Sequence, residues 1–442
     1  IIKMFKETSK ELLDFLSKSP TAFHAVENYR QILNADGFKE LLESEHWDIV
    51  PGGKYYVTRN NTSILAFKVG TKLDNYSFNI VTSHTDSPTF KVKENAEIEV
   101  KNKYTQLNTE GYGGMLCATW LDRPLSIAGR VLVSEGNSIV TKLLNIDRDL
   151  LMIPNVAIHM NRAANDGFKY NLQVDMLPLL SAGDDRQKDF KQIIADELGV
   201  KKEDILGHDL YLYNRMAPSI WGANEEFISA GHLDDLQCGF ASLKALLAGY
   251  NDESIDIMAC FDNEEVGSGT KQGADSTLLR DTLTRINSAL GKTEEDYHRA
   301  LASSFMLSSD NAHAVHPNHP EHTDATNCTY MNEGVVVKSH AGQKYTSDGV
   351  SMAVVKALAS GADVPLQYFA NRSDKAGGST LGNIAMAQAS MNAVDIGLPQ
   401  LAMHSSYETA GIKDTYYAIT LMKALFDSHI QETSTHSLEI KR

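Results

Sequence analysis

The sequence predicts an α/β fold: a three-layer domain built around a mixed, largely parallel sheet, with a β-rich domain inserted into it. Apolar strands and amphipathic helices alternate at both ends of the chain, which is typical of helices packed on a largely parallel sheet. Between them, residues 92–227 alternate apolar and charged positions and contain one clear helix. The main domain is therefore expected to be discontinuous, formed by residues 1–91 and 228–442.

The first part of the main domain is predicted to begin with two amphipathic helices within the first 40 residues. The second of these helices is predicted to end at Asp36-Gly37, where the glycine is a natural C-cap. Residues 55–67 are predicted to form a hairpin around an Asn-Asn turn, and residues 78–83 a short apolar strand.

The insertion shows the period-two alternation of strands at residues 91–103 and 125–144, with its single helix at 184–199. After residue 228, strands and helices alternate again, so this part is expected to complete the fold that the first 91 residues begin. The strand-like runs are IDIMACFD, SSFMLSSD and GVVVKS, and the helix-like runs are LQCGFASLKALLAGY, SDGVSMAVVKALASG and DTYYAITLMKALF.

Composition and charge exclude several classes of protein. The 57 acidic residues exceed the 41 Lys and Arg and give a net charge of −16, which argues against a binder of nucleic acid or anionic membrane. No apolar run approaches the ~20 residues that a transmembrane helix needs. The cysteines form no Cys-x-x-Cys pair, so we expect no disulfide framework and a reducing, cytoplasmic location. They are Cys117, Cys238, Cys260 and Cys328.

Five short polar segments stand out, most of them at the end of an apolar strand, where open α/β sheets bind their ligands. Each alone has an ordinary structural explanation, such as a helix cap or a solvated acidic turn. Their recurrence at equivalent places in one alternating domain favours a shared site instead. The segments are SHTDSP at 83–88, HLDDL at 232–236, DNEEVGS at 262–268, SSDNAHAVHP at 308–317 and AMHSSYE at 402–408.

Histidine nitrogen combined with carboxylate oxygen suits zinc or a related divalent cation. A bridging carboxylate with two further pairs of ligands would make a dinuclear site, which activates water and polarises a carbonyl group. Of the adjacent Glu264 and Glu265, one can bind a metal while the other serves as general base. In the histidine run that follows Asp310, we expect His319 and His322 to lie on a solvated loop.

Together, the motifs HTDSP, NEEVGS, SSDNAHAVHPN and LAMHS resemble those of the aspartyl aminopeptidase/aminopeptidase I family of dinuclear-zinc metallopeptidases. The resemblance runs over nearly the whole chain. It implies an α/β peptidase domain with an inserted β-rich dimerisation domain, two Zn²⁺ per chain that Mn²⁺ or Co²⁺ can replace, and a tetrahedral dodecamer. One departure is visible, because Asp235 stands where many relatives carry Asn.

The resemblance also implies which residues hold the metals. His84 of HTDSP and Asp310 of SSDNAHAVHP would bind one zinc ion. Glu265 of NEEVGS and His404 of AMHS would bind the other. Asp234 of HLDD would bridge the two ions.

Further roles follow from the same resemblance. Glu264 would be the general base, and Asp86 would orient the metal-binding histidine two residues before it. Lys338 and Tyr345 match residues that hold an acidic substrate side chain, and His159 matches a histidine that a neighbouring subunit donates to the site.

The functional hypothesis is a dinuclear-zinc aminopeptidase that releases N-terminal residues, preferably Asp or Glu, from peptides. Its expected partners are peptide substrates and further copies of itself. The alternatives are an aminopeptidase of neutral or broad specificity, and a related dimetal carboxypeptidase or N-deacylase. From another class, a noncatalytic, zinc-stabilised assembly protein is the remaining alternative, although structural zinc sites need no spare base such as Glu264.

Overall fold

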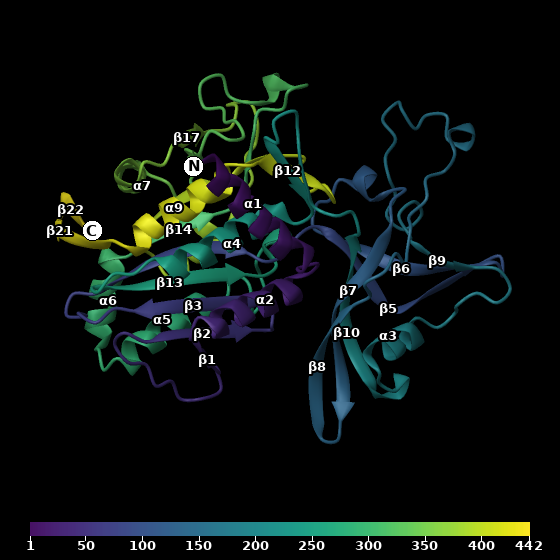
Figure 1. Ribbon diagram of the computed structural model, residues 1–442, viewed down its shortest axis with the longest axis horizontal. Helices are drawn as coiled ribbons and strands as arrows, with labels where there is room; N and C mark the ends of the chain where they lie inside the picture. Colours follow the sequence, from purple (N-terminus) through teal and green to yellow (C-terminus); the bar gives the residue numbers. More distant parts are fainter.

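A computed structural model, which describes residues 1–442, divides the protein into a larger lobe around a nine-stranded sheet and a smaller β-rich lobe beside it (Figure 1). Most neighbours in the large sheet run parallel, with antiparallel pairs at β2–β3, β3–β13 and β16–β18. The predicted α/β fold with a mixed, largely parallel sheet is confirmed. In spatial order the strands are β1 (Lys39–Leu41), β2 (Lys54–Arg59), β3 (Ser63–Val69), β13 (Ser254–Phe261), β4 (Ser77–His84), β14 (Phe305–Ser309), β18 (Asn392–Gly397), β16 (Val335–Lys338) and β17 (Leu366–Phe369).

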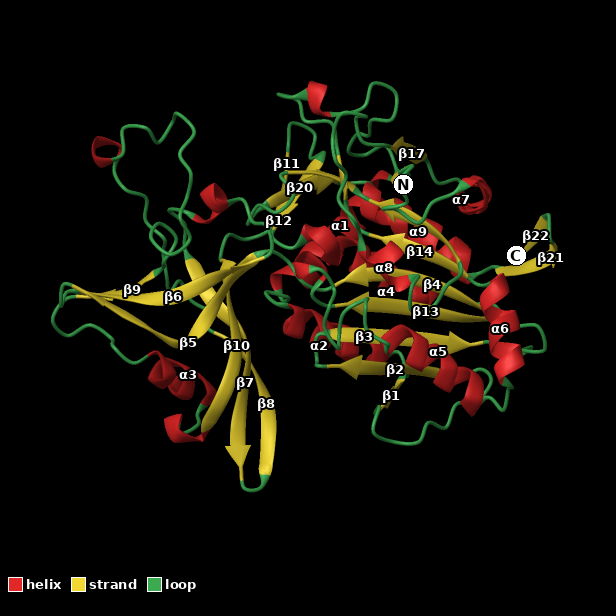
Figure 2. Ribbon diagram, turned by 180° about the vertical axis from the view of Figure 1, so that it is seen from behind, coloured by secondary structure: helices red, strands yellow, loops and turns green.

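Helices cover both faces of this sheet and give three layers (Figure 2). Neighbouring strand residues point to opposite faces, so that Val81 belongs to a core of 44 buried residues on one face and Ile80 to a core of 27 on the other. The first core is completed by α1 (Ile2–Ser17), α2 (Ala22–Ala35), α4 (Leu233–Ala248), α7 (Gly349–Ala362) and α9 (Asp414–Phe426). The second is completed by α5 (Leu278–Ala289), α6 (Glu294–Ser303) and α8 (Leu381–Ala385).

Local signals explain where the first elements start and stop. The Thr21 side chain caps α2 by accepting a hydrogen bond from the backbone N–H of His24, and the chain leaves the helix through Gly37 at φ +86°. The predicted hairpin forms from β2 and β3, and both turn residues, Asn60 and Asn61, adopt positive φ. Such a turn matches the right-handed twist of the two strands.

The smaller lobe is an antiparallel sheet of six strands with a core of 21 buried residues of its own. Helix α3 (Phe190–Leu198) contributes to that core. A separate sheet core within the segment supports the proposed insertion at 92–227. In spatial order the strands are β8 (Ser138–Asn145), β7 (Leu125–Glu135), β10 (Ile205–Asn214), β5 (Thr89–Val100), β6 (Tyr104–Tyr112) and β9 (Leu179–Ala182).

A third sheet has five strands, which come from the end of the insertion and from the C-terminal part of the main domain. The chain ends in a separate hairpin. None of the helices combines the length and apolar character of a membrane span. The five-stranded sheet contains β11 (Ser219–Trp221), β12 (Phe227–Ala230), β20 (Glu408–Gly411), β19 (Pro399–Leu401) and β15 (Ala312–His313). The terminal hairpin is formed by β21 (His429–Ser434) and β22 (Ser437–Lys441).

Three neighbouring parallel strands of the large sheet end side by side and place the polar motifs together. β4 lies between β13 and β14 and ends at His84, which is directly opposite Phe261 at the end of β13. Asp310 follows β14 directly, and Asp234 lies at the start of α4. The carboxyl edge of the sheet therefore gathers residues that are far apart in the sequence.

Candidate active site

The carboxylate of Asp234 lies between two histidines. Its Oδ1 is 3.2 Å from His84 Nε2, and its Oδ2 is 3.3 Å from His404 Nε2. His84 is fully buried at the end of β4, whereas His404 lies in the turn between β19 and β20. One carboxylate thus faces two imidazoles with different oxygens, which is the arrangement that a bridging ligand requires.

Each histidine has a second carboxylate beside it. Asp310 Oδ1 is 3.4 Å from His84 Nε2, and Glu265 Oε2 is 3.2 Å from His404 Nε2. Two ligands bound at about 2.0–2.1 Å to one tetrahedral zinc ion lie roughly 3.3 Å apart. The observed separations therefore fit two metal positions that share Asp234.

The chemistry of this cluster fits a divalent cation. His84 Nε2 and Asp234 Oδ1 are buried without a hydrogen-bond partner, although buried polar atoms normally have one. Burial and the charge of Asp234 raise the pKa of Glu265 to about 8, and the same two causes raise the pKa of Asp310. Bound cations would compensate the crowded negative charge and satisfy the unpartnered atoms.

Glu264 lies at the edge of the cluster and differs from its neighbour Glu265. Its Oε2 is 3.6 Å from His84 Nε2, and its carboxylate accepts no hydrogen bond from the protein. Burial, followed by the charge of Asp310, raises the pKa of Glu264 to about 9. A carboxylate that is close to the metal positions and otherwise unengaged is available to exchange a proton.

Asp86 connects the histidine ligand with the two glutamates. Its carboxylate accepts hydrogen bonds from His84 Nδ1 at 3.1 Å and from the Tyr112 hydroxyl at 2.7 Å. It also accepts from the backbone N–H groups of Glu264 and Glu265, at 3.2 and 3.0 Å. Asp86 therefore contacts the imidazole through Nδ1 and also anchors the turn that carries the glutamates.

Glu408 supports the other side of the cluster and was missed by the sequence reasoning. Its buried carboxylate accepts from the backbone N–H groups of Asp234 and His404, at 3.1 and 2.8 Å, and from Gln400 Nε2 at 2.9 Å. Burial raises the pKa of Glu408 to about 8. The segment AMHSSYE contains this residue, but nothing in the segment indicates that the side chain of Glu408 points into the protein.

His404 is held by a second contact, because its Nδ1 donates a hydrogen bond to the carbonyl oxygen of Gly114 at 2.9 Å.

Asp235 faces the site. Its Oδ2 accepts a hydrogen bond from the backbone N–H of His84 at 3.1 Å, while Oδ1 is buried without a partner. Burial and the charge of Asp310 raise the pKa of Asp235 well above its usual range. The aspartate at this position can therefore hold a proton and add little negative charge to the cluster.

Lys338 and Tyr345 lie together beside the cluster. Lys338 is buried at the end of β16, where its Nζ donates to the carbonyl oxygen of Asn311 at 3.2 Å and lies 5.5 Å from the centre of the Tyr345 ring. Burial opposes its positive charge, but Asp310, Tyr345 and Asp395 raise the pKa of Lys338 above its usual value. The ammonium group stays charged and keeps two N–H groups for other acceptors.

The remaining histidines occupy different places. His159 is exposed on the short helix η2 (Ile158–Met160), and no hydrogen bond or ion pair joins it to the ligand cluster; the loop around this helix extends from the smaller lobe (Figure 1). His319 and His322 are exposed on a loop, as expected. His313 was not singled out by the sequence; it is the last residue of β15, is exposed, and has its ring centre 6.4 Å from that of Phe369.

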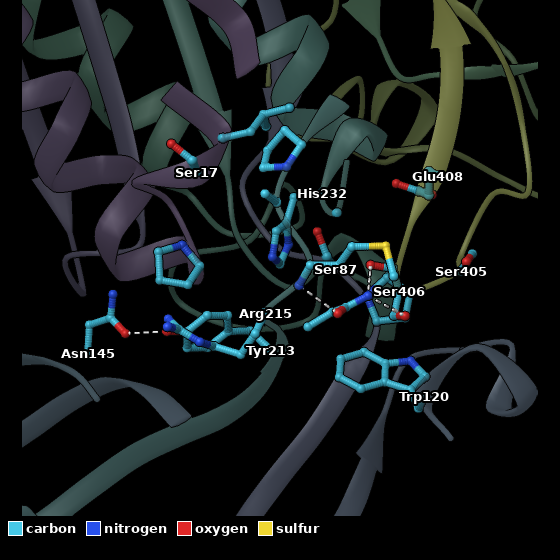
Figure 3. A pocket seen from close by; sticks show the side chains of 18 of the residues that line it. Ser17, Ser87, Trp120, Asn145, Tyr213, Arg215, His232, Ser405, Ser406 and Glu408 are labelled. Carbon is cyan, nitrogen blue, oxygen red and sulfur yellow. Dashed lines mark hydrogen bonds between the residues drawn. The ribbon is translucent and has the colours of Figure 1, made fainter. Parts of the chain in front are cut away.

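A cavity of about 240 Å³ lies between the two lobes beside the cluster (Figure 3). Ser87, Ser406 and Glu408 line it from the larger lobe, and Trp120 and Tyr213 face them from the smaller lobe. The smaller lobe thus forms one wall of the space next to Glu408.

Comparison with known proteins identifies the family of the chain. The sequence profile of a family described as aminopeptidase I zinc metalloprotease (M18) matches residues 15–426. A probable M18 family aminopeptidase 2 of Clostridium novyi is 48% identical over 425 residues, which are 95% of this chain and 98% of that protein. One from Stutzerimonas stutzeri is 39% identical over 431 residues, covering 96% and 99%.

Solved structures show the same fold. A chain in the cryo-EM structure of the Ape4 and Nbr1 complex has a TM-score of 0.92 and 34% identity, covering 96% of this chain and 86% of that one. A chain of the S. cerevisiae mApe1 dodecamer has a TM-score of 0.83 and 28% identity, covering 96% and 97%.

Proposed function

Because this chain belongs to the M18 family of aminopeptidase I zinc metalloproteases and is a metallo-aminopeptidase, we propose that it releases N-terminal residues with two zinc ions. The observation that carries the proposal is the position of Asp234, whose two oxygens face His84 and His404 at 3.2 and 3.3 Å. With a single ion, either the pair of Asp234 and His84 or the pair of Asp234 and His404 would have no cation between its two side chains.

The separations support the ligand roles. His84 and Asp310 would hold one zinc ion, Glu265 and His404 would hold the other, and Asp234 would be shared by both. The mixed nitrogen and oxygen donors also suit Mn²⁺ or Co²⁺ as substitutes. Asp86 and Glu408 hold these ligands in place through the hydrogen bonds described above.

Zinc held there would lower the pKa of water and polarise the scissile carbonyl group. Glu264 takes a proton from the attacking water and delivers it to the nitrogen of the leaving amine as the peptide bond breaks. The hydrogen bond from its backbone N–H to Asp86 keeps Glu264 beside His84 during both transfers. One carboxylate therefore acts first as base and then as acid.

The preferred N-terminal residue is proposed to be Asp or Glu. Lys338 supports this preference because it is a buried cation with free N–H groups next to the proposed metal positions. Tyr345 lies beside it, with its ring centre 5.5 Å from Lys338 Nζ, and would contact the same substrate side chain.

The active form is proposed to be a closed homo-oligomer, a dodecamer like the S. cerevisiae protein to which the chain is similar. The loop that carries His159 supports this assembly, because Met160 and Val174 in it are 78% and 71% exposed. The loop also exposes Val156, Ile158, Phe168 and Leu172. A concentration of exposed apolar side chains marks a protein contact. A second copy that covers the loop would carry His159 to the neighbouring active site. The cytoplasmic location expected from the cysteine pattern is part of the same proposal.

A panel of peptides tests the function. Metal-reconstituted protein should release single N-terminal residues from free peptides, fastest from those that begin with Asp or Glu, and should not act on N-acetylated copies. Cleavage of blocked peptides would favour a carboxypeptidase or N-deacylase. Faster cleavage of peptides that begin with Leu would favour neutral specificity, and no cleavage at all would favour the noncatalytic assembly protein.

A further inference from the structure

The loop that follows β15 carries histidines that the catalytic site does not use (green, at the top of Figure 1). Its base is fixed by a hydrogen bond from Val315 N to Thr329 O at 2.8 Å and by one from the Thr329 hydroxyl to His313 O at 2.7 Å. Between these bonds, the short helix η5 (Pro320–His322) projects into solvent. We refer to residues 316–328 as the histidine loop.

Three possible metal ligands meet on this loop. One ligand atom from each of His319, Glu321 and His322 lies within 4.8 Å of the others, and all three side chains are exposed. The rings of His319 and His322 are stacked, with centroids 5.1 Å apart. Two imidazoles bound to one tetrahedral zinc ion have centroids about 5 Å apart, because each Zn–N bond is about 2.0–2.1 Å long.

The local backbone accounts for this alignment. His319 is the N-cap of η5 and His322 is its last residue, three positions later. Side chains at positions i and i+3 eclipse each other on a 3₁₀-helix, and Pro320 fixes the first turn because its ring restrains φ. The two imidazoles are therefore held near each other before any ion binds.

Glu321 prepares His319 for coordination. His319 Nδ1–H donates a hydrogen bond to Glu321 Oε1 at 2.8 Å. The lone pair of His319 then lies on Nε2, and a carboxylate that receives the Nδ1 proton raises the basicity of the ring. The second oxygen of Glu321 stays free to bind a cation.

The charges around the loop permit a cation. Arg372 is the nearby positive group, since it donates to the carbonyl oxygen of Glu321. Its guanidinium also forms hydrogen bonds of 3.0 and 2.9 Å with the carboxylate of Asp374, which neutralises it. The free histidine nitrogens therefore face no uncompensated positive charge.

We propose that His319, Glu321 and His322 bind a Zn²⁺ ion at a site separate from the catalytic centre, with water as the remaining ligand. The ion joins the two ends of η5 and stiffens the histidine loop. Because Arg372 already ties the loop to the segment after β17, the stiffening extends to that segment as well. The histidine loop begins a few residues after Asp310. Zinc binding would therefore make this loop, which adjoins the active site, more ordered as the zinc concentration rises.

Zinc binding to the assembled enzyme tests the proposal. Protein with its catalytic centre saturated is titrated with Zn²⁺ in a calorimeter, and the ions per chain are counted by elemental analysis. We expect one ion beyond those of the His319→Ala/His322→Ala double variant. Loss of supporting carboxylates costs about 10–100-fold in metal affinity, so Glu321→Gln should weaken this ion by at least about 10-fold.

The control is His298→Ala. His298 is an exposed histidine 3.7 Å from Glu294 on α6, and it has no second imidazole beside it. This variant should keep the additional ion. Hydrogen exchange within the histidine loop should slow on addition of Zn²⁺ in the wild type and in His298→Ala, but not in the double variant.

Three results would overturn the site. The double variant could bind as many ions as the wild type with the same affinity, or the wild type could show no ion beyond the catalytic ones. A stoichiometry of one additional ion per two chains would also contradict it, because the ligands would then come from two copies. The mutated side chains are exposed, so the variants should fold, and their melting temperatures check this directly.

Discussion

Replacing Glu264 with Gln separates proton transfer from metal binding. The carboxylate accepts no hydrogen bond from the protein, so an amide of the same shape removes no structural contact. It does remove the group that takes the proton from water. Loss of a general base costs about 10²–10⁴-fold in rate, which corresponds to a barrier higher by about 3–5 kcal/mol. We therefore expect kcat to fall by that factor while the zinc content and the melting temperature of the enzyme stay unchanged.

Glu265→Gln is the matched control because it makes the same chemical change one residue later. Glu265 Oε2 lies 3.2 Å from His404 Nε2, in the position of a metal ligand. This variant should lose zinc on dialysis and regain activity when excess Zn²⁺ is added. Glu264→Gln should keep its zinc and gain nothing from the addition.

The assay measures kcat on a peptide that begins with Asp, together with zinc per chain after dialysis. A Glu264→Gln enzyme with nearly wild-type kcat would refute the assignment of the base. Equal loss of zinc from both variants would show that the two glutamates are both ligands.

Four further predictions concern other parts of the molecule. The saturated wild-type chain should hold two zinc ions and Asp234→Asn fewer, as measured by elemental analysis; at most one ion in the active wild type would contradict the dinuclear site. Lys338→Met should lower kcat/KM for peptides beginning with Asp by about 10²-fold, since truncating one partner of a buried charge pair costs about 2–5 kcal/mol. The kcat/KM for peptides beginning with Leu should stay unchanged. An equal loss of kcat/KM on both kinds of peptide would mean that Lys338 is structural. His159→Ala should reduce activity of the oligomer although the residue is exposed in one chain, and a fully active wild-type monomer in solution would contradict this role. Burial lowers the pKa of His24 to about 4 from its ordinary 6.5, so the folded state disfavours protonation of this histidine. The free energy of unfolding should therefore fall as pH drops from 6.5 to 4, by up to about 3 kcal/mol. The variant His24→Asn should show a smaller fall in melting temperature over that range, and a pH profile equal to that of the wild type would contradict the prediction.

The gathering of the proposed metal ligands at one edge of the sheet could be predicted from the sequence because strand ends are visible in it, whereas the role of each ligand came from the family resemblance. His84 and Asp310 each end an apolar run, and parallel strands place such ends at one edge of the sheet. The supporting residues could not be predicted in this way. Tyr112 reaches Asp86 from the smaller lobe, and Glu408 turns inward from β20, so both depend on how distant segments pack.

Elements without a polar motif were also harder to predict. The main helices and strands were expected from their periodicity, but α5 and α6 were not singled out. The apolar residues of α5 do recur at spacings of three and four on one face, whereas α6 buries only Tyr297 and Ala300. The position of Lys338 is a similar case. A lysine at the end of a strand is ordinarily solvated, and only the packing of β16 between β17 and β18 shows that this one is buried.

The charges of the site explain why an acidic substrate would depend on the metals. Asp234, Glu265 and Asp310 together carry three negative charges when ionised, which two zinc ions would exceed by one, and the ionised base Glu264 would cancel that excess. Lys338 is then the group whose charge decides between acidic and neutral side chains, although Asp395 directly opposite on β18 offsets part of it. Without the metals, the site loses four positive charges and therefore attracts an acidic peptide much less strongly. Binding of a peptide that begins with Asp should therefore weaken far more on removal of zinc than binding of one that begins with Leu.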